Sequence, residues 1–474
     1  MRRTNSVSHS GSVWLLTEIC GGKYGSKSKR KIQMRNNDQL TEDSNSASKA
    51  DFAVQVHSDI ACNRCGCVCD DLTVSVADGC VVKFQPDCSV ADPWFESLRT
   101  ALPSSAAEIN GHAVDLEAAL DEATRLIRKA RAPLFFGLSR SSTDGQRAVC
   151  ELADRIGATI DTTASIGHGP SIVAFQNAGE STSTLGEVRH RSDVVIYWAC
   201  DPLTSHPRHM ERFVEASGLS IPNGRKDRHV IVVDSEPTAT SAQADTFLRI
   251  EKGSDFEVLW TLRALLKGIE ISEPTIGGVD IEALRQLAQR MKGSHYGAVF
   301  FGVSLTESST GNTNVEALLR LVTDLNMFTR FVARRMRVPG DVTGADSVLC
   351  WQTGYPFSVS LSRGFPRFNP VEYSAGPMLE RNETDCVILV GAERVDRFSE
   401  GARSNLHKIP VILLDPPNAN WNVRADVRFN TAIYGVHRRA TAYRMDEVPV
   451  PLRKIIDSPL PSDDEVLRAI LNRL

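Results

Sequence analysis

Short apolar runs alternate with amphipathic stretches over most of the chain beyond residue 115. Each run contains an unbroken apolar stretch, as is typical of parallel strands buried on both faces. The six runs cover residues 133–139, 193–199, 229–235, 297–304, 386–393 and 410–416. Between them, segments such as 115–130 and 314–326 repeat apolar residues at helical spacing. The alternation predicts a doubly wound α/β fold.

The six runs form three similar pairs. PLFFGLS resembles GAVFFGVS, SDVVIYWACDP resembles TDCVILVGAER, and RHVIVVDSE resembles IPVILLDPP. The third pair is followed in both copies by an Ala-Asp step before a last strand. We therefore expect two related doubly wound α/β units that descend from one, with the crevice where they meet as the default ligand site. The alternative is chance similarity between hydrophobic strands.

Composition shifts divide the chain into four parts. Residues 1–50 are rich in Ser, Asn, Lys and Arg without periodicity, so we expect a disordered tail, and Met34 is a candidate for the true start. We expect residues 51–100 to form a cysteine-rich subdomain of iron-sulfur type. We assign residues 101–290 to the first α/β unit and residues 291–474 to the second unit with the C-terminal segment.

Charge and hydropathy exclude several classes of protein. The net charge of −4 attracts neither nucleic acid nor an anionic membrane. No apolar run has the 18 or so residues of a transmembrane helix, and the apolar cluster near the start is too short for a secretory signal. We expect a cytoplasmic protein. No strand is followed by GxGxxG or by a GxxxxGK[ST] phosphate loop, so common NAD and ATP sites lack a sequence basis.

A cluster of cysteines precedes the α/β part. Cys62, Cys65 and Cys69 have C-x2-C-x3-C spacing, and Cys88 follows beyond a predicted hairpin that turns at residues 78–79. Three thiolates on one tight loop and a fourth from the far end of a hairpin favour a [4Fe–4S] cluster. A zinc site and an empty, vestigial loop are the alternatives, although zinc ribbons usually use two C-x2-C pairs. We expect the intervening Cys67, like Cys80, to be a poorer ligand, with Cys67 pointing away from the others.

Three long motifs carry a family resemblance. They are CNRCGCVCDDL, the stretch from ASIGHGPSIVAFQ to SHPRHMERF, and RVPGDVTGADSVLCWQTGYPFSVSLSRGFPRFNP. Over roughly residues 55–440 the chain resembles the molybdopterin- and tungstopterin-dependent oxidoreductases, and in particular the B subunit of formylmethanofuran dehydrogenase. The resemblance implies a molybdopterin-oxidoreductase-like fold, other subunits of the complex as partners, and a pterin dinucleotide that holds molybdenum or tungsten.

The resemblance also implies which residues form the site, and one of them is altered. The family has a cysteine or selenocysteine metal ligand just before His-Gly-Pro-Ser, and this chain has Gly167 there. The adjacent histidine is His168, and the arginine of the formate-oxidising site falls on Arg337. Asp341 replaces an asparagine of the family, and we expect its added negative charge to disfavour a cofactor with two phosphates. Because glycine supplies no ligand, metal-based oxidation of formate looks lost and the pterin cofactor absent.

Each candidate residue also has a plainer interpretation. His168 fits a role in shaping its loop through backbone hydrogen bonds. Arg337 lies in a basic stretch that suits a solvated or subunit-facing surface, or an anion site. Asp234 and Asp415 end equivalent runs, where a carboxylate often contacts a ribose or guanine, but they also suit loop caps. The two histidines of SHPRHMERF lack a matching carboxylate, so we do not expect a metal there, and we expect the aromatic segment 353–370 to pack against another subunit or the former pterin cleft.

Two functions follow from the resemblance. One is a scaffold subunit of a formyltransferase/hydrolase complex in tetrahydromethanopterin-linked one-carbon metabolism, in which other subunits carry out the formyl chemistry. The other is a catalytic oxidoreductase subunit that interconverts formylmethanofuran with formate or CO2. Gly167 favours the scaffold, whereas the four cysteines favour the redox subunit. A small-molecule binding protein that uses a relic cleft is a third, weaker alternative.

The cysteine motif generates a direct prediction. Protein purified without oxygen is expected to contain about four iron atoms per chain and to show the broad visible absorbance of a cluster. Cys65→Ser is expected to remove that absorbance, because serine does not supply a thiolate. Stoichiometric zinc in place of iron, measured by elemental analysis, would instead establish a structural zinc site.

Overall fold

The computed structural model describes residues 54–98, 102–103, 105–307, 310–338, 340–417, 419 and 422–474. The expected tail of residues 1–50 and the alternative start at Met34 lie outside these residues. Among the described residues, no helix is both long and apolar enough to cross a membrane.

The smaller of two main sheets is parallel throughout. Its strand order is β10-β9-β8-β13-β14, and every neighbouring pair runs in the same direction. These strands are β8 (Val194–Trp198), β9 (His229–Asp234), β10 (Thr246–Arg249), β13 (Tyr296–Phe301) and β14 (Arg330–Arg335). The apolar runs at 193–199, 229–235 and 297–304 thus form strands as expected, and β8 and β13 are buried along their whole length.

The larger sheet has a parallel centre and antiparallel edges. Its order is β16-β15-β7-β6-β17-β18-β19-β4-β5, with β7 to β19 parallel. The parallel strands are β6 (Pro133–Gly137), β7 (Thr159–Thr162), β17 (Cys386–Val390), β18 (Val411–Asp415) and β19 (Val427–Asn430). The edges are β4 (Ala107–Ile109), β5 (His112–Val114), β15 (Val359–Ser360) and β16 (Arg367–Phe368).

The two sheets repeat one topology, as the paired runs predict. The order β10-β9-β8-β13-β14 corresponds strand for strand to β19-β18-β17-β6-β7. Each pair of similar sequences therefore occupies the same place in its own sheet, and the predicted mixed α/β architecture is confirmed.

The division of the chain between the sheets differs from the boundary expected at residue 290. The smaller sheet uses residues 194–335, whereas the larger sheet takes strands from both 107–162 and 359–430. The physical reason is the repeat itself. Because β6 and β13 are equivalent in sequence, their pattern does not show which of the two sheets each strand joins.

Helices cover both faces of each sheet, which explains the continuous apolar runs. In β8, Val195 and Tyr197 face one core, while Ile196 and Trp198 face another. In the larger sheet the side chains of β6 divide in the same way, because Phe135 lies in one core and Phe136 in the opposite one. A helix on only one face would have produced alternation of apolar and polar residues instead.

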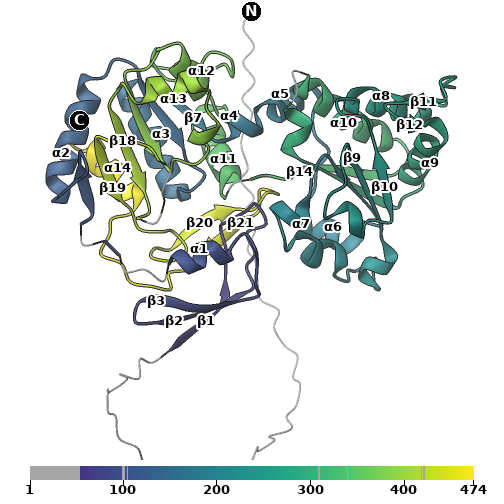
Figure 1. Ribbon diagram of the computed structural model, residues 1–474, viewed down its shortest axis with the longest axis horizontal. Helices are drawn as coiled ribbons and strands as arrows, with labels where there is room; N and C mark the ends of the chain where they lie inside the picture. The colour runs from purple at the N-terminus through teal and green to yellow at the C-terminus, as the bar shows by residue number, and fades with distance from the viewer. Residues whose placement is uncertain are drawn as a thin grey trace, which may run out of the picture. The chain divides into compact units, whose positions relative to one another are not determined.

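The helices fall into two groups. Around the larger sheet lie α2 (Leu116–Lys129), α3 (Thr143–Ile156), α11 (Val342–Thr353), α12 (Ala375–Glu380), α13 (Glu400–Leu406) and α14 (Asp463–Leu471). Around the smaller sheet lie α5 (Gly169–Ala178), α6 (Leu185–Arg191), α7 (Pro202–Ser205), α8 (Asp255–Leu266), α9 (Ile281–Lys292) and α10 (Gly311–Leu325) (Figure 1). Shorter elements are α4 (Ala164–Gly167), β11 (Thr275–Ile276), β12 (Val279–Asp280), a π-helical turn at Met210–Glu215, and 3-10 turns at Gly224–Asp227, Ser241–Gln243, Val303–Thr306 and Val395–Arg397.

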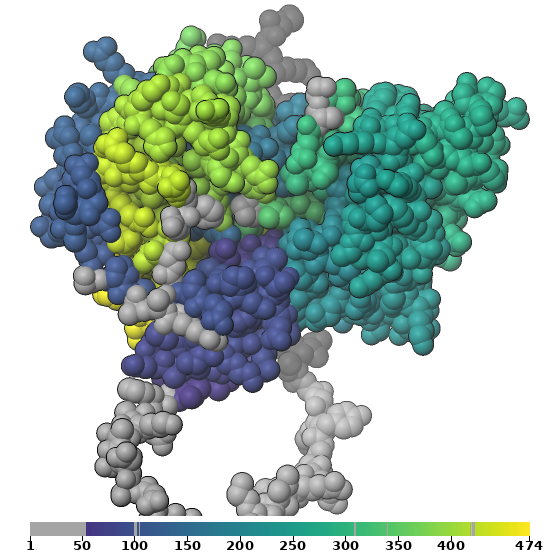
Figure 2. Space-filling model, in the orientation of Figure 1, coloured from purple at the N-terminus to yellow at the C-terminus, as the bar shows by residue number. Residues whose placement is uncertain are grey.

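The cysteine-rich subdomain is a small antiparallel sheet with a loop and one helix. It consists of β1 (Gln55–Ile60), β2 (Leu72–Ala77), β3 (Cys80–Gln85) and α1 (Asp92–Ser97). The expected hairpin turn is present, because Asp78 and Gly79 both have positive φ, 50° and 70°. The cysteine loop shares one hydrophobic core with β8, β13 and the C-terminal segment that contains β20 (Ala440–Tyr443) and β21 (Pro449–Leu452). In Figure 2 the subdomain lies against both other parts of the chain.

The chain passes between the two α/β lobes in two places. It leaves the larger sheet after β7 through α4 and α5, and it returns after β14 into α11 (Figure 1). The return segment touches the cysteine loop closely. A Cβ on Gly66 would lie 2.6 Å from the Arg337 carbonyl oxygen and 3.1 Å from Met445 Cβ.

That approach predicts that Gly66 does not tolerate a side chain. Gly66→Ala is expected to lower the free energy of unfolding by about 1–3 kcal/mol, because backbone atoms must move to admit the methyl group. Gly186→Ala is the matched control, since the added Cβ would meet only Thr184 Oγ1, at 3.6 Å, and alanine favours the α6 helix. Chemical denaturation measures both variants, and equal stability of the two would contradict the close contact.

Candidate functional site

The two crossing segments bring His168 and Arg337 together. His168 follows α4, and Arg337 lies two residues beyond β14. The Val338 amide donates a 3.5 Å hydrogen bond to His168 Nε2. Both side chains are buried, with 3% of His168 and 4% of Arg337 exposed. The interpretation that Arg337 lies on a solvated surface is therefore wrong, because this arginine lies inside the protein.

His168 is a neutral side chain within the loop. Burial, together with the charge of nearby Arg337, lowers its pKa well below the ordinary value. Since Nε2 accepts a hydrogen bond, the ring proton resides on Nδ1. The contact to backbone matches the loop-shaping role that the sequence left open.

The Arg337 guanidinium is already paired. Nη2 forms a buried ion pair with Asp346 of α11, and Thr162 at the end of β7 donates to the same carboxylate at 2.8 Å. The Arg337 carbonyl oxygen is held by His206 Nε2 at 3.0 Å. His206 thus supports the return segment.

Gly167 is partly exposed and has an ordinary helical backbone conformation. It ends α4, and the Thr306 hydroxyl donates to its carbonyl oxygen at 2.9 Å. A Cβ at this position would lie 2.9 Å from Val303 Cγ1. Val303 is therefore the one close neighbour that a side chain at this position would meet at its Cβ.

Asp341 has a different role from the one the sequence suggested. It caps α11 by accepting from the Gly344 amide at 3.0 Å, and it also accepts from the Tyr443 amide at 2.7 Å. The side chain is fully buried, and burial raises its pKa to about 8 in spite of these hydrogen bonds. Burial thus favours the neutral form of Asp341, and its expected repulsion of phosphates stays a prediction.

The predicted cysteine ligands lie near one another in the loop. The Cys62 amide donates to the Cys69 carbonyl at 2.7 Å, which closes the loop, and Cys62, Cys65 and Cys69 are buried. Burial and the nearby thiols raise the pKa of Cys62, and burial also raises that of Cys88. Among the described residues, no three His, Cys, Asp or Glu side chains are placed to hold a single metal ion.

Cys67 differs from the expectation that it points away. It is completely buried, and its thiol is hydrogen-bonded with both Cys65 and Cys69, which raises the pKa of Cys67. The bend that permits this includes Val68 at a φ of 37°. Spacing alone did not reveal it, because such a loop does not follow helical or strand geometry. Whether the four predicted cysteines hold a cluster stays a prediction.

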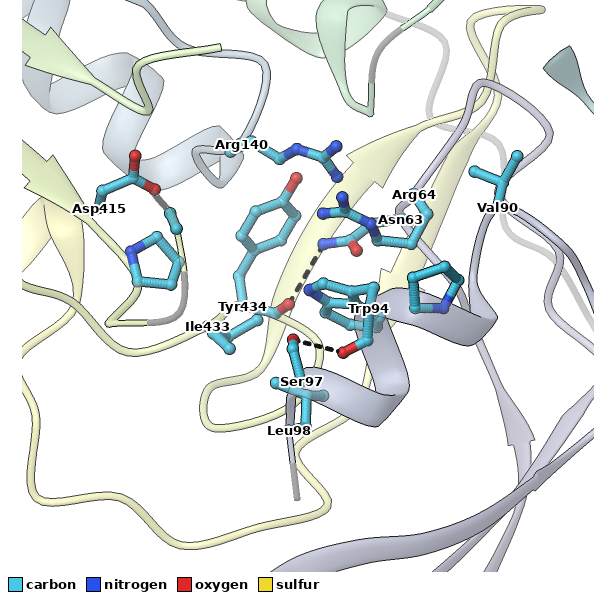
Figure 3. Close-up of a pocket in the computed structure, with 13 residues that line it drawn as sticks. Asn63, Arg64, Val90, Trp94, Ser97, Leu98, Arg140, Asp415, Ile433 and Tyr434 are labelled. Carbon is cyan, nitrogen blue, oxygen red and sulfur yellow. Dashed lines mark hydrogen bonds between the residues drawn. The ribbon is translucent and has the colours of Figure 1, made fainter. Parts of the chain in front are cut away.

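A cavity of about 290 Å³ lies between the cysteine-rich subdomain and the larger sheet. Arg64, Arg140 and the Tyr434 hydroxyl point toward the same space, beside Trp94 (Figure 3). Arg140 is paired with Glu393, and the Arg64 guanidinium stacks over the Trp94 ring at 5.2 Å. Several of their atoms are buried without a hydrogen-bond partner among the described residues. These atoms are Asn63 Oδ1, Arg64 Nε, Arg140 Nη1 and Tyr434 Oη.

The predicted carboxylates end up in separate cavities. Asp415, at the end of β18, lines the cavity described above and accepts from the Ala392 amide at 3.2 Å. Asp234, at the end of β9, lines another cavity of about 480 Å³ and accepts from the Ser235 amide at 2.8 Å. Burial raises the pKa of Asp234. The two positions are equivalent in the repeated topology, and both carboxylates make the loop-capping contacts of the plainer interpretation.

The comparisons with known proteins identify the family. The chain is 37% identical over 431 residues to the B subunit of the tungsten-containing formylmethanofuran dehydrogenase 2 of Methanocaldococcus jannaschii, a match that covers 89% of this chain and 99% of the relative. The chain belongs to the family of formylmethanofuran dehydrogenase B subunits. The Methanococcus maripaludis protein of the same name is 34% identical with the same coverage. The B subunit of the formyltransferase/hydrolase complex Fhc of Methylorubrum extorquens is 26% identical over 60% of this chain and 74% of the relative. No protein-family profile matches the chain.

Solved structures confirm the fold. A chain of the formyltransferase/hydrolase complex FhcABCD from Methylorubrum extorquens, in complex with methylofuran, superposes with a TM-score of 0.65 at 21% identity and covers 78% of this chain and 98% of that chain. Acetylene hydratase from Pelobacter acetylenicus superposes with a TM-score of 0.62 at 11% identity, over 88% of this chain and 69% of that chain. The molybdopterin-oxidoreductase-like fold is thus confirmed, and other subunits of such a complex are the expected partners.

The pterin cofactor implied by the family fits this site in part. The unpaired donors of Arg64, Arg140 and Tyr434 suit the phosphates of a nucleotide. The part of the cofactor that holds the metal does not fit, because Gly167 has no donor atom, and Val303 Cγ1 would lie 2.9 Å from a Cβ there. The sequence analysis missed Arg64, Arg140, Trp94 and Tyr434. These residues can be recognised as site residues only because the fold brings them to one cavity, although Arg64 also lies inside the cysteine motif.

The state of Asp341 generates a prediction for pH dependence. Its folded pKa of about 8 lies above the unfolded value of about 4, so the folded state keeps a proton that the unfolded state releases in this range. Through this group, the free energy of unfolding falls as the pH rises from about 4 to about 8. Asp341→Asn keeps a neutral cap, so the variant is expected to lose less stability than the native protein between about pH 5 and pH 8.

Urea unfolding at both pH values measures the difference. Asp280→Asn is the control, because Asp280 is an exposed cap of α9 that accepts from the Glu282 amide at 2.7 Å. That variant is expected to keep the native pH dependence. An unchanged pH dependence in Asp341→Asn would show that Asp341 is ionised in the folded protein.

Proposed function

We propose that this chain is the B subunit of a formylmethanofuran dehydrogenase-type complex in tetrahydromethanopterin-linked formyl and formate metabolism, and that it is a scaffold without redox chemistry of its own. The family membership supports the first part of the proposal. Gly167 carries the second part. In this function the chain holds its partner subunits together, and those subunits transfer and hydrolyse the formyl group.

The position of the missing metal ligand argues against redox chemistry. The family resemblance places a cysteine or selenocysteine, as the ligand of molybdenum or tungsten, at this position. Gly167 has none, and a side chain there would meet Val303 Cγ1 at 2.9 Å. Val303 belongs to a 3-10 turn whose Thr306 also donates to the Gly167 carbonyl oxygen, so the same turn contacts the glycine through two residues.

The other two residues of the expected site, Arg337 and His168, already have partners within the protein. The Arg337 guanidinium is paired with buried Asp346, so its charge is already compensated. His168 is buried, neutral and bonded to the Val338 amide. An arginine that binds formate needs a free bidentate face, and a histidine that exchanges protons needs access to the substrate.

A catalytic molybdopterin or tungstopterin subunit is the second candidate. It is favoured by the higher identity and coverage with the tungsten-containing relatives than with the Fhc protein. The unpaired donors of the cavity at Arg64 and Arg140 also favour it, because they suit a nucleotide-bearing cofactor. The two candidates differ in metal content and in formate-dependent electron transfer.

The purified complex is therefore expected to release formate from its formylated carrier without reducing viologen dyes when formate is supplied. Tungsten and molybdenum are expected to be far below one atom per chain by elemental analysis. Gly167→Cys is expected to leave dye reduction absent, since the Cβ of the new side chain would lie against Val303 Cγ1.

A pair of stability measurements checks the packing on which this rests. Gly167→Ala is expected to lower the free energy of unfolding by about 1–3 kcal/mol, and the double variant Gly167→Ala, Val303→Ala to recover part of it. Formate-dependent dye reduction by the native complex, together with stoichiometric tungsten or molybdenum, would establish the catalytic candidate instead.

A further inference from the structure

The cavity between the cysteine-rich subdomain and the larger sheet contains hydrogen-bond donors without acceptors. Tyr434 Oη, Arg64 Nε and Arg140 Nη1 are buried and make no hydrogen bond within the part of the chain that the structure describes. The three side chains point toward one space (Figure 3). A buried donor without an acceptor is costly, so three that converge indicate a ligand that accepts from them.

The two guanidinium groups bring positive charge to the same end of the cavity. Glu393 compensates Arg140, whereas Arg64 forms no ion pair with any described residue and lies over the Trp94 ring. Burial, and then the charge of Arg140, lower the pKa of Arg64 to about 10. In Figure 3, Asp415 lies on the side of Tyr434 away from Arg64. The guanidinium end is therefore suited to a negatively charged ligand group.

The repeated topology allows a comparison with the equivalent place in the smaller lobe. Arg140 lies three residues beyond the end of β6, and the residue three positions beyond β13 is Ser304. Tyr434 lies four residues beyond β19, and the residue four positions beyond β10 is Gly253. Ser304 and Gly253 both line the cavity at Asp234. The smaller lobe thus has the equivalent cavity without these two donors.

The cavity of the smaller lobe also has the opposite charge. Four carboxylates line it against one lysine, and these residues are Asp234, Glu236, Asp255, Glu307 and Lys252. Carboxylates repel a phosphate at close range, and the repulsion is strongest where water is excluded. The two lobes therefore differ in ligand chemistry, although their strands have the same arrangement.

We propose that the cavity at Arg64, Arg140 and Tyr434 binds the phosphate group of one nucleotide per chain, and that the smaller lobe binds no second one. The two guanidinium groups and the Tyr434 hydroxyl donate to phosphate oxygens. Asn63 Oδ1, which is also buried without a partner among the described residues, accepts from a hydroxyl or amino group of the nucleotide. The volume of about 290 Å³ lies near the lower end for ligand pockets and suits a single nucleotide unit.

A free nucleotide and the nucleotide part of a pterin dinucleotide share this chemistry. The experiment separates them by denaturing the purified complex and analysing the released compounds by chromatography and mass spectrometry. Oxidation makes a released pterin fluorescent, whereas a free nucleotide gives no such signal. The complex is then dialysed free of ligand and titrated calorimetrically with guanosine monophosphate, adenosine monophosphate, inorganic phosphate and formate.

Two variants of the full chain in its complex test the donors. Tyr434→Phe removes the hydroxyl, and Tyr197→Phe is its matched control, because Tyr197 Oη is also buried without a partner among the described residues but lies outside the cavity. Arg64→Met removes the charge and keeps an apolar side chain over Trp94. Arg125→Gln is its control, since Arg125 pairs with Glu122 on α2 and its side chain is 59% exposed.

The native complex is expected to bind one nucleotide per chain, more tightly than inorganic phosphate and much more tightly than formate. Tyr434→Phe and Arg64→Met are expected to weaken nucleotide binding about 10-fold or more, because each loses a hydrogen bond to a charged group. Both controls are expected to bind as the native protein does. Without ligand, Tyr434→Phe is expected to unfold at or above the native midpoint, since the lost hydroxyl had no partner.

Four results would overturn the proposal. They are a native complex that neither retains nor binds a nucleotide, two nucleotides per chain, formate binding as tight as nucleotide binding, and native affinity in both Tyr434→Phe and Arg64→Met. A nucleotide released with or without a fluorescent pterin supports the site and identifies its source. Molybdenum or tungsten in the complex would contradict the scaffold function and leave this proposal intact, so the two can fail separately.

Discussion

The contact between the return segment after β14 and the cysteine loop joins the cysteine-rich subdomain to the two α/β lobes. The Arg337 carbonyl oxygen is pressed against Gly66 and bonded by His206, and the Gly340 amide reaches the Arg64 carbonyl at 3.4 Å. Gly340 has a φ of 44°, and a Cβ there would lie 2.5 Å from the Ser139 carbonyl oxygen. Backbone therefore meets backbone from the cysteine loop, the larger sheet and the smaller sheet within one short stretch.

That arrangement explains why so many charged groups are buried near the centre. Arg335 pairs with Glu180 at 2.9 Å, Arg337 pairs with Asp346, and Arg140 pairs with Glu393. Each pair joins segments that are distant in sequence or belong to the two crossings between lobes. Buried pairs of this kind contribute little net stability, but removing one partner leaves an uncompensated charge. These pairs therefore determine which segments meet, and they add little to the free energy of unfolding.

The sequence predicted the elements better than their assembly. The six apolar runs became buried parallel strands because their pattern reports burial on both faces, and the paired runs occupy equivalent positions in the two sheets. The predicted boundary at residue 290 between the two α/β units was wrong. Equivalent strands have similar sequences, and those sequences do not show which sheet each strand joins. At the site, His168, Gly167 and Arg337 were found through a motif. Val303 and Tyr434 were not, because they are brought there by packing between segments more than a hundred residues apart.

The divided origin of the larger sheet bears on the order in which the chain folds during synthesis. Strand β6 pairs on one side with β7 and on the other with β17, where Pro133 lies opposite Cys386. The smaller sheet, at residues 194–335, leaves the ribosome complete while β17 is still untranslated. Until then the apolar edge of β6, with Leu134, Phe135 and Phe136, has no strand to cover it. The nascent protein thus carries an open, aggregation-prone sheet edge for the time needed to translate the intervening lobe, which makes chaperone binding at β6 and slow, concentration-sensitive refolding in vitro the natural consequence of this topology.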